Sequence, residues 1–180
     1  MVFSLIVNGK LSIPILIRLF RPEDQPAARE LVLQGLSEHW GELDQSLNPD
    51  LADIAATYGQ AIFLVAVVGP ELVGTGALIP EREGVGRIVR MSVAQTWRRQ
   101  GVGRQILAEL LRRAAPAGYR QLVLETTATW AEAIAFYRNN GFQEVGVWEG
   151  DIHFVINCEA GLGAGAEAED GAAGVLTGDV

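Results

Sequence analysis

The segment from residue 87 to residue 114 changes its hydrophobic period at a glycine-rich loop. RIVRMSVA (87–94) is a short apolar run typical of a strand, whereas apolar side chains recur every three or four residues across 102–114, as on one face of a helix. The loop between them is WRRQGVGR (97–104). A strand that enters a helix through such a loop directs the unpaired amides of the first helical turn toward one point. We therefore expect an anion-binding strand–loop–helix unit.

The tetrapeptide GVGR occurs twice, at 84–87 and at 101–104, and we expect the two copies to serve different purposes. In the second copy, glycines let a ligand approach the backbone closely, and Arg98, Arg99 and Arg104 flank it. We interpret this copy as a pyrophosphate cradle. The first copy lies between two predicted strands and is not followed by a helix, so we interpret it as a turn.

Two familiar phosphate-binding motifs are absent from this loop. A Walker loop requires Gly-x-x-x-x-Gly-Lys-Ser/Thr, which does not occur in the chain. A dinucleotide fingerprint requires a third glycine at the position that Ile106 occupies. The loop therefore indicates a phosphate ligand of another kind.

Strand and helix signals alternate along the rest of the chain. Helix starts are indicated by Pro22, by Asn48 as an N-cap, and by a capping box of Thr129 and Glu132, while Gly141 supplies a helix stop. The expected order is β-α-α-β-β-β-α-β-α-β-β, which predicts a single α/β domain with a mixed sheet flanked by helices. The expected strands are 15–20, 61–68, 71–79, 87–94, 119–126, 142–148 and 152–157, and the expected helices are 21–38, 48–58, 102–114 and 129–140.

Composition and charge divide the chain into three parts. With 49% hydrophobic and 20% charged residues, 180 residues suffice for one globular domain, which we place at 15–157 after an N-terminal extension at 1–14. Residues 158–180 are rich in Gly and Ala, contain acids but no Lys or Arg, and are expected to form a disordered tail. Five of the acids lie in this tail, and the remaining 17 acidic against 14 basic residues argue against nucleic acid as the main partner. No apolar run reaches the length of a membrane span.

Cysteine and histidine usage gives two further expectations. The single cysteine, Cys158, rules out an intrachain disulfide and fits a cytoplasmic location. His39 and His153 show no metal-ligand spacing, so no metal is expected. The apolar stretch at residues 1–20 is interrupted by polar residues and lacks a cleavage site, so we do not expect a secretory signal.

Two motifs resemble those of a known superfamily. Arg98-Arg99-Gln100-Gly101-Val102-Gly103 is similar to the Arg/Gln-x-x-Gly-x-Gly/Ala signature of the GNAT N-acetyltransferases, and AIAFYRNNGF (133–142) resembles their Ala-x-x-x-Tyr-x-x-x-Gly-Phe signature. The resemblance covers about 17–157. It implies the GNAT fold, acetyl-coenzyme A as co-substrate, and N-acetylation of a primary amine. We expect this amine to belong to a small molecule in preference to a protein. A sensor that binds acyl-coenzyme A without turnover is the alternative, and a structural dimerising domain is a third reading.

The resemblance also implies roles for particular residues. Backbone amides of the loop bind the cofactor pyrophosphate, the strand beside it binds the pantetheine arm, and Tyr137 protonates the departing thiolate. Tyr137 on a half-buried helix face could instead be structural. The implied cofactor-binding residues are Met91, Ser92, Val93, Arg98, Arg99, Gln100, Gly101, Val102, Gly103 and Arg104. Such domains often dimerise through sheet edges, so a homodimer is also expected.

The chain departs from the family at two positions of the site. Trp130 stands seven residues before Tyr137, where many relatives have an asparagine that contacts the cofactor. Arg87 stands where many relatives have a glutamate that acts as general base. The base is therefore open among Glu125, which we select as the catalytic candidate, His39, His153 and a bound water.

The acceptor is expected to contact the segment SEHWGELDQSLNPD (37–50) and neighbouring strands. His39 and Trp40 in this segment could recognise an amine or be ordinary loop residues. Arg90 could pair with a substrate carboxylate, or it could be a strand residue neutralised by a nearby acid. His153, in the closing hairpin, is the fourth candidate for substrate binding.

Overall fold

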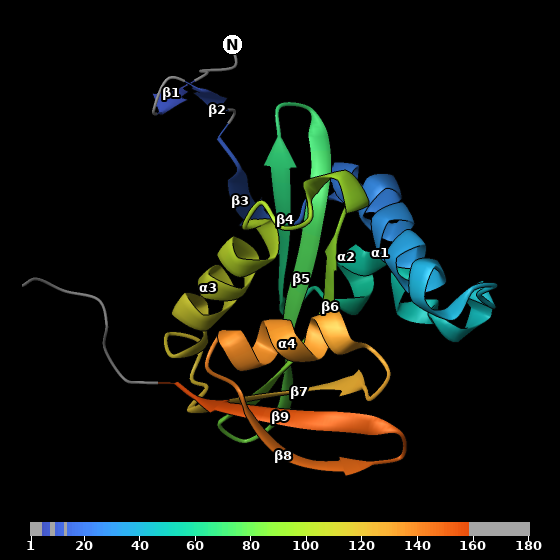
Figure 1. Cartoon of the computed structure of the whole chain (residues 1–180), viewed down its shortest axis with the longest axis vertical. Coiled ribbons are helices and arrows are strands. Elements are labelled where there is room, and N and C mark those ends of the chain that lie inside the picture. Colours follow the sequence, from blue (N-terminus) through green and yellow to red (C-terminus); the bar gives the residue numbers. More distant parts are fainter. Residues whose placement is uncertain (1–4, 8–9, 13, 159–180) are drawn as a thin grey trace, which may run out of the picture.

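The computed structural model describes residues 5–7, 10–12 and 14–158, and shows a seven-stranded sheet with helices on both faces (Figure 1). The strand order is β3-β4-β5-β6-β7-β9-β8, and all neighbours pair antiparallel except β6 and β7. The strands of this sheet are β3 (Leu16–Leu19), β4 (Ile62–Val68), β5 (Glu71–Arg82), β6 (Val85–Val93), β7 (Gln121–Thr127), β8 (Gln143–Trp148) and β9 (Asp151–Asn157). The predicted α/β class with a mixed sheet is confirmed.

Helices form a layer on each face of the sheet. The helices are α1 (Gln25–Trp40), α2 (Ile54–Thr57), α3 (Val102–Ala114) and α4 (Ala131–Asn139), with short 3-10 turns η1 (Pro22–Asp24), η2 (Gln45–Leu47), η3 (Pro49–Leu51) and η4 (Gln95–Trp97). α1 and α2 pack on one face, whereas α3 and α4 pack on the other (Figure 1). Burial of apolar side chains from both layers against β4 and β5 provides the main stabilisation.

The stripe predicted on 102–114 is the buried face of α3. Val102, Ile106, Leu110 and Ala114 are each no more than 1% exposed and pack on the central strands. Gly101 adopts φ +84 before the helix, a left-handed conformation that glycine reaches without steric cost. The predicted strand–loop–helix unit is therefore present.

The sheet opens on one side of β6, beyond its short pairing with β7. These two strands pair only from Val85–Arg87 to Gln121–Val123. On its other side, β6 carries a bulge, because Thr75 pairs with Ser92 and Ala77 with Val89, so that one residue of β5 lies opposite two of β6. The second half of β6 therefore has a free edge toward β7.

Arg90, one of the two bulge residues, has φ +55, which is uncommon for a side chain other than glycine. The buried Thr75 hydroxyl donates a hydrogen bond to the Arg90 carbonyl oxygen at 2.8 Å. Such strained backbone persists only where surrounding contacts hold it.

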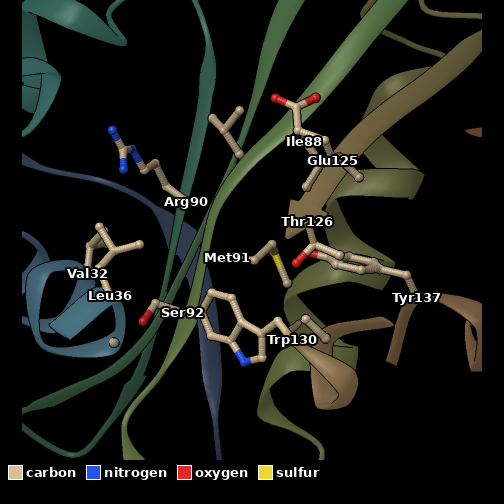
Figure 2. Close-up of a pocket in the computed structure, with 13 residues that line it drawn as sticks. Val32, Leu36, Ile88, Arg90, Met91, Ser92, Glu125, Thr126, Trp130 and Tyr137 are labelled. Atoms are coloured by element: carbon tan, nitrogen blue, oxygen red, sulfur yellow. The ribbon is translucent and has the colours of Figure 1, made fainter. Parts of the chain in front are cut away.

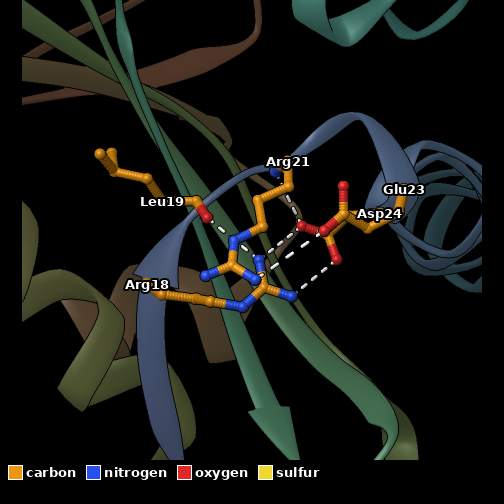
Figure 3. A network of polar contacts seen from close by, with 5 residues as sticks. All are labelled: Arg18, Leu19, Arg21, Glu23 and Asp24. Atoms are coloured by element: carbon orange, nitrogen blue, oxygen red, sulfur yellow. Dashed lines mark hydrogen bonds and ion pairs between the residues drawn. The ribbon is translucent and has the colours of Figure 1, made fainter.

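The junction between β3 and α1 is fixed by an ion pair (Figure 3). Arg18 donates two hydrogen bonds to the carboxylate of Asp24, at 2.6 and 2.8 Å, and the Arg21 amide donates a third at 2.8 Å. Asp24 is only 8% exposed. The Arg18 guanidinium, aided by the Arg21 amide, holds the pKa of Asp24 below its ordinary value despite burial.

Two predicted side-chain caps are absent. Asn48 does precede the first helical residue, Pro49, as expected, but its side chain accepts from Arg90 instead of capping. The helix expected at 48–58 is divided into η3 and α2, and Asp53 caps α2 by accepting from the Ala56 amide at 2.9 Å. The capping box of Thr129 is also absent, since α4 begins after Trp130 without a side-chain cap. The Thr129 hydroxyl lies 3.4 Å from His39 Nε2 instead.

The two GVGR copies differ as predicted. Gly84, with φ +70, forms the turn between β5 and β6, and the remaining three residues of the first copy begin β6. The second copy begins α3. The helix stop at Gly141, with φ +88, is likewise present.

The predicted extension contains an antiparallel pair, β1 (Leu5–Val7) with β2 (Lys10–Ser12), which was not expected. The expected disordered tail lies outside the described residues, apart from Cys158. No helix in the described part of the chain is long and apolar enough to cross a membrane. Within the same residues, no group of three or more His, Cys, Asp or Glu is placed to hold a metal ion.

Candidate active site

Two connected openings lie along the free edge of β6. The first, which we call the β6–β7 cavity, has a volume of about 210 Å³ and is lined by β6, β7, α1 and α4. The second, the α3–α4 groove, has a volume of about 690 Å³ and runs from the start of α3 to α4. The residues common to both are Met91, Ser92, Trp130, Ala133 and Tyr137.

The N-terminus of α3 forms one end of the α3–α4 groove. The first intrahelical hydrogen bond runs from the Gln105 amide to the Gly101 carbonyl at 3.0 Å, and no side chain caps the helix. The amides of Val102, Gly103 and Arg104 therefore lack intrahelical partners. Together with the positive end of the helix dipole, these amides can bind an anion.

The arginines around this helix start differ in their contacts. Arg98 donates to the Val93 carbonyl at 3.0 Å and pairs with Glu38 of α1, so it ties the loop to its neighbours. The Arg99 side chain is 89% exposed and lies 3.1 Å from Glu132, and Arg104 is exposed. Arg99 and Arg104 are therefore the cations at the groove surface that a phosphate can reach.

Nearly all the predicted cofactor-binding residues line the α3–α4 groove. The exception is Gln100, whose side chain donates to the Thr96 carbonyl at 2.7 Å within its own loop. The lining members are Met91, Ser92, Val93, Arg98, Arg99, Gly101, Val102, Gly103 and Arg104.

Tyr137 stands between the two openings. Its ring packs against Phe136, Phe142 and Phe154 at centroid distances of 5.2, 5.6 and 5.9 Å, and the residue is 8% exposed. Burial raises the pKa of its hydroxyl. No residue in the described chain forms a hydrogen bond with that hydroxyl, which therefore remains protonated at neutral pH and free to donate.

Glu125 lines the β6–β7 cavity, but its carboxylate is paired. Arg87 contacts Glu125 and also Glu81, at 2.7 and 2.8 Å, and Figure 2 shows the Glu125 carboxylate directed away from Tyr137. Arg87 therefore holds two carboxylates at once, and its hydrogen bonds lower the pKa of Glu81.

Arg90 also lines the cavity, and its guanidinium is occupied. Nε and Nη2 donate to Asp50 at 2.8 and 2.5 Å, and Nη1 donates to Asn48 at 2.9 Å. The Tyr58 hydroxyl donates to Asp50 at 2.5 Å. Of the two alternatives for Arg90, the structure shows the strand residue neutralised by an acid.

These contacts shift the pKa values of the groups that take part in them. Burial would raise the pKa of Asp50, but hydrogen bonds from Arg90 and Tyr58 hold it below its ordinary value. Burial and the bond to Asp50 raise the pKa of Tyr58 to about 12. At neutral pH, Asp50 is therefore an anion and Tyr58 is neutral.

The three aromatic candidates for substrate binding lie outside the lining of both openings. His39 stacks on Trp130 with centroids 4.4 Å apart, and Trp40 meets His39 edge-on and is 56% exposed. His153, opposite Glu125 in the sheet, stacks on Trp148 at 3.6 Å. His39 thus supports the cavity wall from behind Trp130.

Sequence reasoning missed the contribution of α1 and η3. Val32, Gly35 and Leu36 line the cavity, and Asp50 neutralises Arg90. A signal existed at Gly35, because a glycine inside a helix costs about 1 kcal/mol relative to alanine and so indicates close packing. A Cβ there would lie 2.6 Å from Ser92 Oγ. Asp50 gave no comparable signal.

The site combines a sheet that opens beside its parallel pair of strands, a helix that begins at glycines, and a buried tyrosine between two openings. Together these features define a GNAT-type acyltransferase domain. The chain belongs to the acetyltransferase (GNAT) family, which matches residues 26–142. The predicted superfamily is thereby confirmed.

Curated relatives are about one-third identical to this chain over the residues that match. It is 33% identical to N-acetyltransferase 8F1 of Rattus norvegicus over 107 residues, covering 56% of this chain and 48% of the relative. It is 34% identical to the IAA acetyltransferase of Azospirillum brasilense over 117 residues, covering 64% and 76%. The chain thus spans about half the length of the rat relative.

Solved structures share the fold. A GNAT-family acetyltransferase from Staphylococcus aureus Mu50 superposes with a TM-score of 0.74 at 21% identity, covering 81% of this chain and 100% of the other. The PaiA N-acetyltransferase from Thermoplasma acidophilum, solved in complex with coenzyme A, has a TM-score of 0.71 at 16% identity, covering 80% and 99%.

Proposed function

We propose that the protein is an acetyl-coenzyme A-dependent N-acetyltransferase that acts on the primary amine of a small molecule. The observation that carries the proposal is that the α3–α4 groove and the β6–β7 cavity meet at Met91, Ser92 and Tyr137. The groove suits an acyl donor with an anionic end, and the cavity suits an acceptor. Transfer between them requires such a junction.

The groove fits the phosphate end of coenzyme A. The free amides of Val102, Gly103 and Arg104 provide donors, and glycine at 101 and 103 leaves the backbone accessible. Arg99 and Arg104 add positive charge at the surface. The complex of the PaiA relative with coenzyme A supports this assignment.

The free edge of β6 fits the extended arm of the cofactor. Its pairing with β7 ends at Arg87, and Met91, Ser92 and Val93 line the groove beyond that point. Backbone groups of an unpaired strand edge can form hydrogen bonds with an extended, amide-containing ligand, as in strand addition.

Tyr137 is the proposed general acid. The cofactor supplies an acetyl group as a thioester, and amide formation breaks the bond between that acetyl carbon and sulfur. The Tyr137 hydroxyl, protonated and without a partner in the described chain, donates a proton to the departing thiolate.

Glu125 is the proposed proton acceptor, acting through water. It is the only carboxylate that lines the β6–β7 cavity among the described residues. Its carboxylate faces Arg87 and is directed away from Tyr137, so a water molecule must carry the proton from the amine. The proposed acid and the proposed base are therefore separate groups of the same cavity.

The size of the cavity supports a small acceptor. At about 210 Å³ it is smaller than the pockets of roughly 300–1,000 Å³ that hold drug-sized ligands. The relatives named as N-acetyltransferases support transfer to nitrogen.

Calorimetric titration of acetyl-coenzyme A into the wild type, Gly103→Glu and Ala108→Glu tests the cofactor site. Gly103 lines the groove, whereas Ala108 is exposed on α3 and does not, so the two variants add the same charge to one helix. We expect acetyl-coenzyme A to bind the wild type and Ala108→Glu, and to bind Gly103→Glu at least tenfold more weakly. A tenfold loss of affinity corresponds to about 1.4 kcal/mol of binding free energy. Equal affinities for all three would contradict the assignment, and binding without turnover would indicate a sensor.

A further inference from the structure

The charged side chains that line the β6–β7 cavity are already paired with neighbouring side chains. Among the described residues that line it, the ionic groups are Arg90 and Glu125. Arg90 is held by Asp50, and Glu125 is held by Arg87, which also binds Glu81. Two arginines thus face three carboxylates, a balance that repels an incoming anion and attracts a cationic amine.

Asp50 occupies the position that a substrate carboxylate would need. It binds Arg90 through two parallel hydrogen bonds, the arrangement in which arginine recognises carboxylates. The remaining terminal nitrogen donates to Asn48, and the Tyr58 hydroxyl donates to the Asp50 oxygen that also accepts from Arg90 Nε. The side chains of Arg90 and Asp50 are only 21% and 20% exposed.

Displacing Asp50 would be costly. A substrate carboxylate could reach the guanidinium only if Asp50 moved away, which would leave a half-buried carboxylate without its cation. The exchange would replace one ion pair by another and gain no additional hydrogen bonds. The Arg90 guanidinium therefore offers no favourable position for a substrate carboxylate.

The remaining lining is mostly apolar. Val32, Leu36, Ile88, Met91, Trp130 and Ala133 contribute alkyl or aromatic surface to the cavity. In Figure 2, the Arg90 guanidinium lies apart from the group formed by Met91, Trp130 and Tyr137. An acceptor in this cavity therefore packs an apolar body close to the reacting end.

We propose that Asp50 determines acceptor specificity: by occupying Arg90, it makes the cavity select compact alkyl- or arylalkylamines and disfavour amines that carry a carboxylate. The inference rests on the proposed acetyltransferase function. It assigns the specificity to a residue of η3 that lies 40 positions from its partner in the chain.

Matched acceptor pairs test the proposal. Each pair differs by one carboxylate: 3-methylbutylamine and leucine, or 2-phenylethylamine and phenylalanine. The corresponding amino alcohols serve as analogues of similar size in which a hydroxymethyl group replaces the carboxylate. We expect the wild type to acetylate the amine of each pair with a kcat/KM at least tenfold above that of the amino acid. An equal or reversed preference would overturn the proposal.

The variant Asp50→Asn tests the residue itself, because it frees the Arg90 guanidinium to take a carboxylate. We expect the amine-to-amino-acid ratio of kcat/KM to fall at least tenfold. The control is Asp24→Asn, which opens the comparable Arg18–Asp24 pair outside the cavity (Figure 3) and should leave the ratio unchanged. Since the ratio is measured within one protein, a smaller folded fraction cancels.

The outcomes separate this inference from the proposed function. Turnover of some amine with an unchanged ratio in Asp50→Asn would reject the role of Asp50 and leave the acetyltransferase intact. If no amine releases thiol from acetyl-coenzyme A, the proposed function fails instead. In that case calorimetric binding of the same pairs, in the presence of coenzyme A, still measures the preference, and tighter binding of the amino acids would overturn it.

Discussion

The imidazole of His39 lies flat against the indole of Trp130, with ring centroids 4.4 Å and planes 6° apart. His39 belongs to the last turn of α1, and Trp130 immediately precedes α4 and lines both openings of the site. The stack therefore joins helices from opposite layers of the sheet across the candidate active site.

Loss of this stack should weaken substrate binding. We expect His39→Ala to raise the KM values for donor and acceptor severalfold, because Trp130 loses the ring that holds it, and to destabilise the fold by about 1 kcal/mol. Steady-state kinetics and urea denaturation measure the two effects. Trp148→Ala removes the other imidazole–indole stack, with His153, and should lower stability without raising either KM.

Tyr137→Phe should separate catalysis from binding. We expect kcat to fall by roughly 10²–10⁴-fold, the usual contribution of general acid catalysis, with little change in the affinity for acetyl-coenzyme A. Stability should also be unchanged, because the hydroxyl forms no hydrogen bond within the described chain. Single-turnover kinetics with calorimetry would show both. A loss of affinity with unchanged kcat would indicate that the tyrosine only binds.

Stability should fall in acid partly through Asp24. Its pKa is lowered in the folded protein, so its ion pair stabilises the fold above the unfolded pKa of about 3.9 and the stabilisation is lost as the pH falls through the lower folded value. We expect Asp24→Asn to lose about 2 kcal/mol at pH 7. Urea denaturation from pH 7 downward should show the difference from wild type shrinking below about pH 4. A constant difference would contradict this account.

Gly35 should be required for the contact between α1 and β6. We expect Gly35→Ala to destabilise the protein by about 1–3 kcal/mol, because the added Cβ would lie 2.6 Å from Ser92 Oγ. Ser92→Ala in the same chain removes that oxygen, so the double variant should recover most of the loss. A double-mutant cycle by thermal denaturation measures this coupling. Additive effects would show that the contact relaxes freely.

Local sequence signals predicted the parts of this fold that depend on local physics. The apolar stripe of α3, the helix stop at the left-handed Gly141, and the strands of the sheet all follow from periodicity and turn chemistry within short windows. The two openings beside Tyr137 form where these elements meet, so an expected order of elements that is correct also places the site.

The errors arose where a polar side chain found a distant partner. Asn48 and Thr129 have the residue type of an N-cap, but Asn48 accepts from Arg90, 42 positions away, and Thr129 lies next to His39. The pairing of Asp50 with Arg90 is of the same kind. Nothing within a local window distinguishes such contacts from capping, so the acceptor side of the site could not be predicted as well as the cofactor side.

The most direct test of the acetyltransferase assignment is simultaneous measurement of both products. The wild-type protein is incubated with acetyl-coenzyme A and 2-phenylethylamine, and free thiol and N-acetylated amine are quantified, the latter by mass spectrometry. The account predicts equal amounts of the two, and their loss in Tyr137→Phe. Binding of acetyl-coenzyme A without acetylated product, across a panel of primary amines, would contradict it.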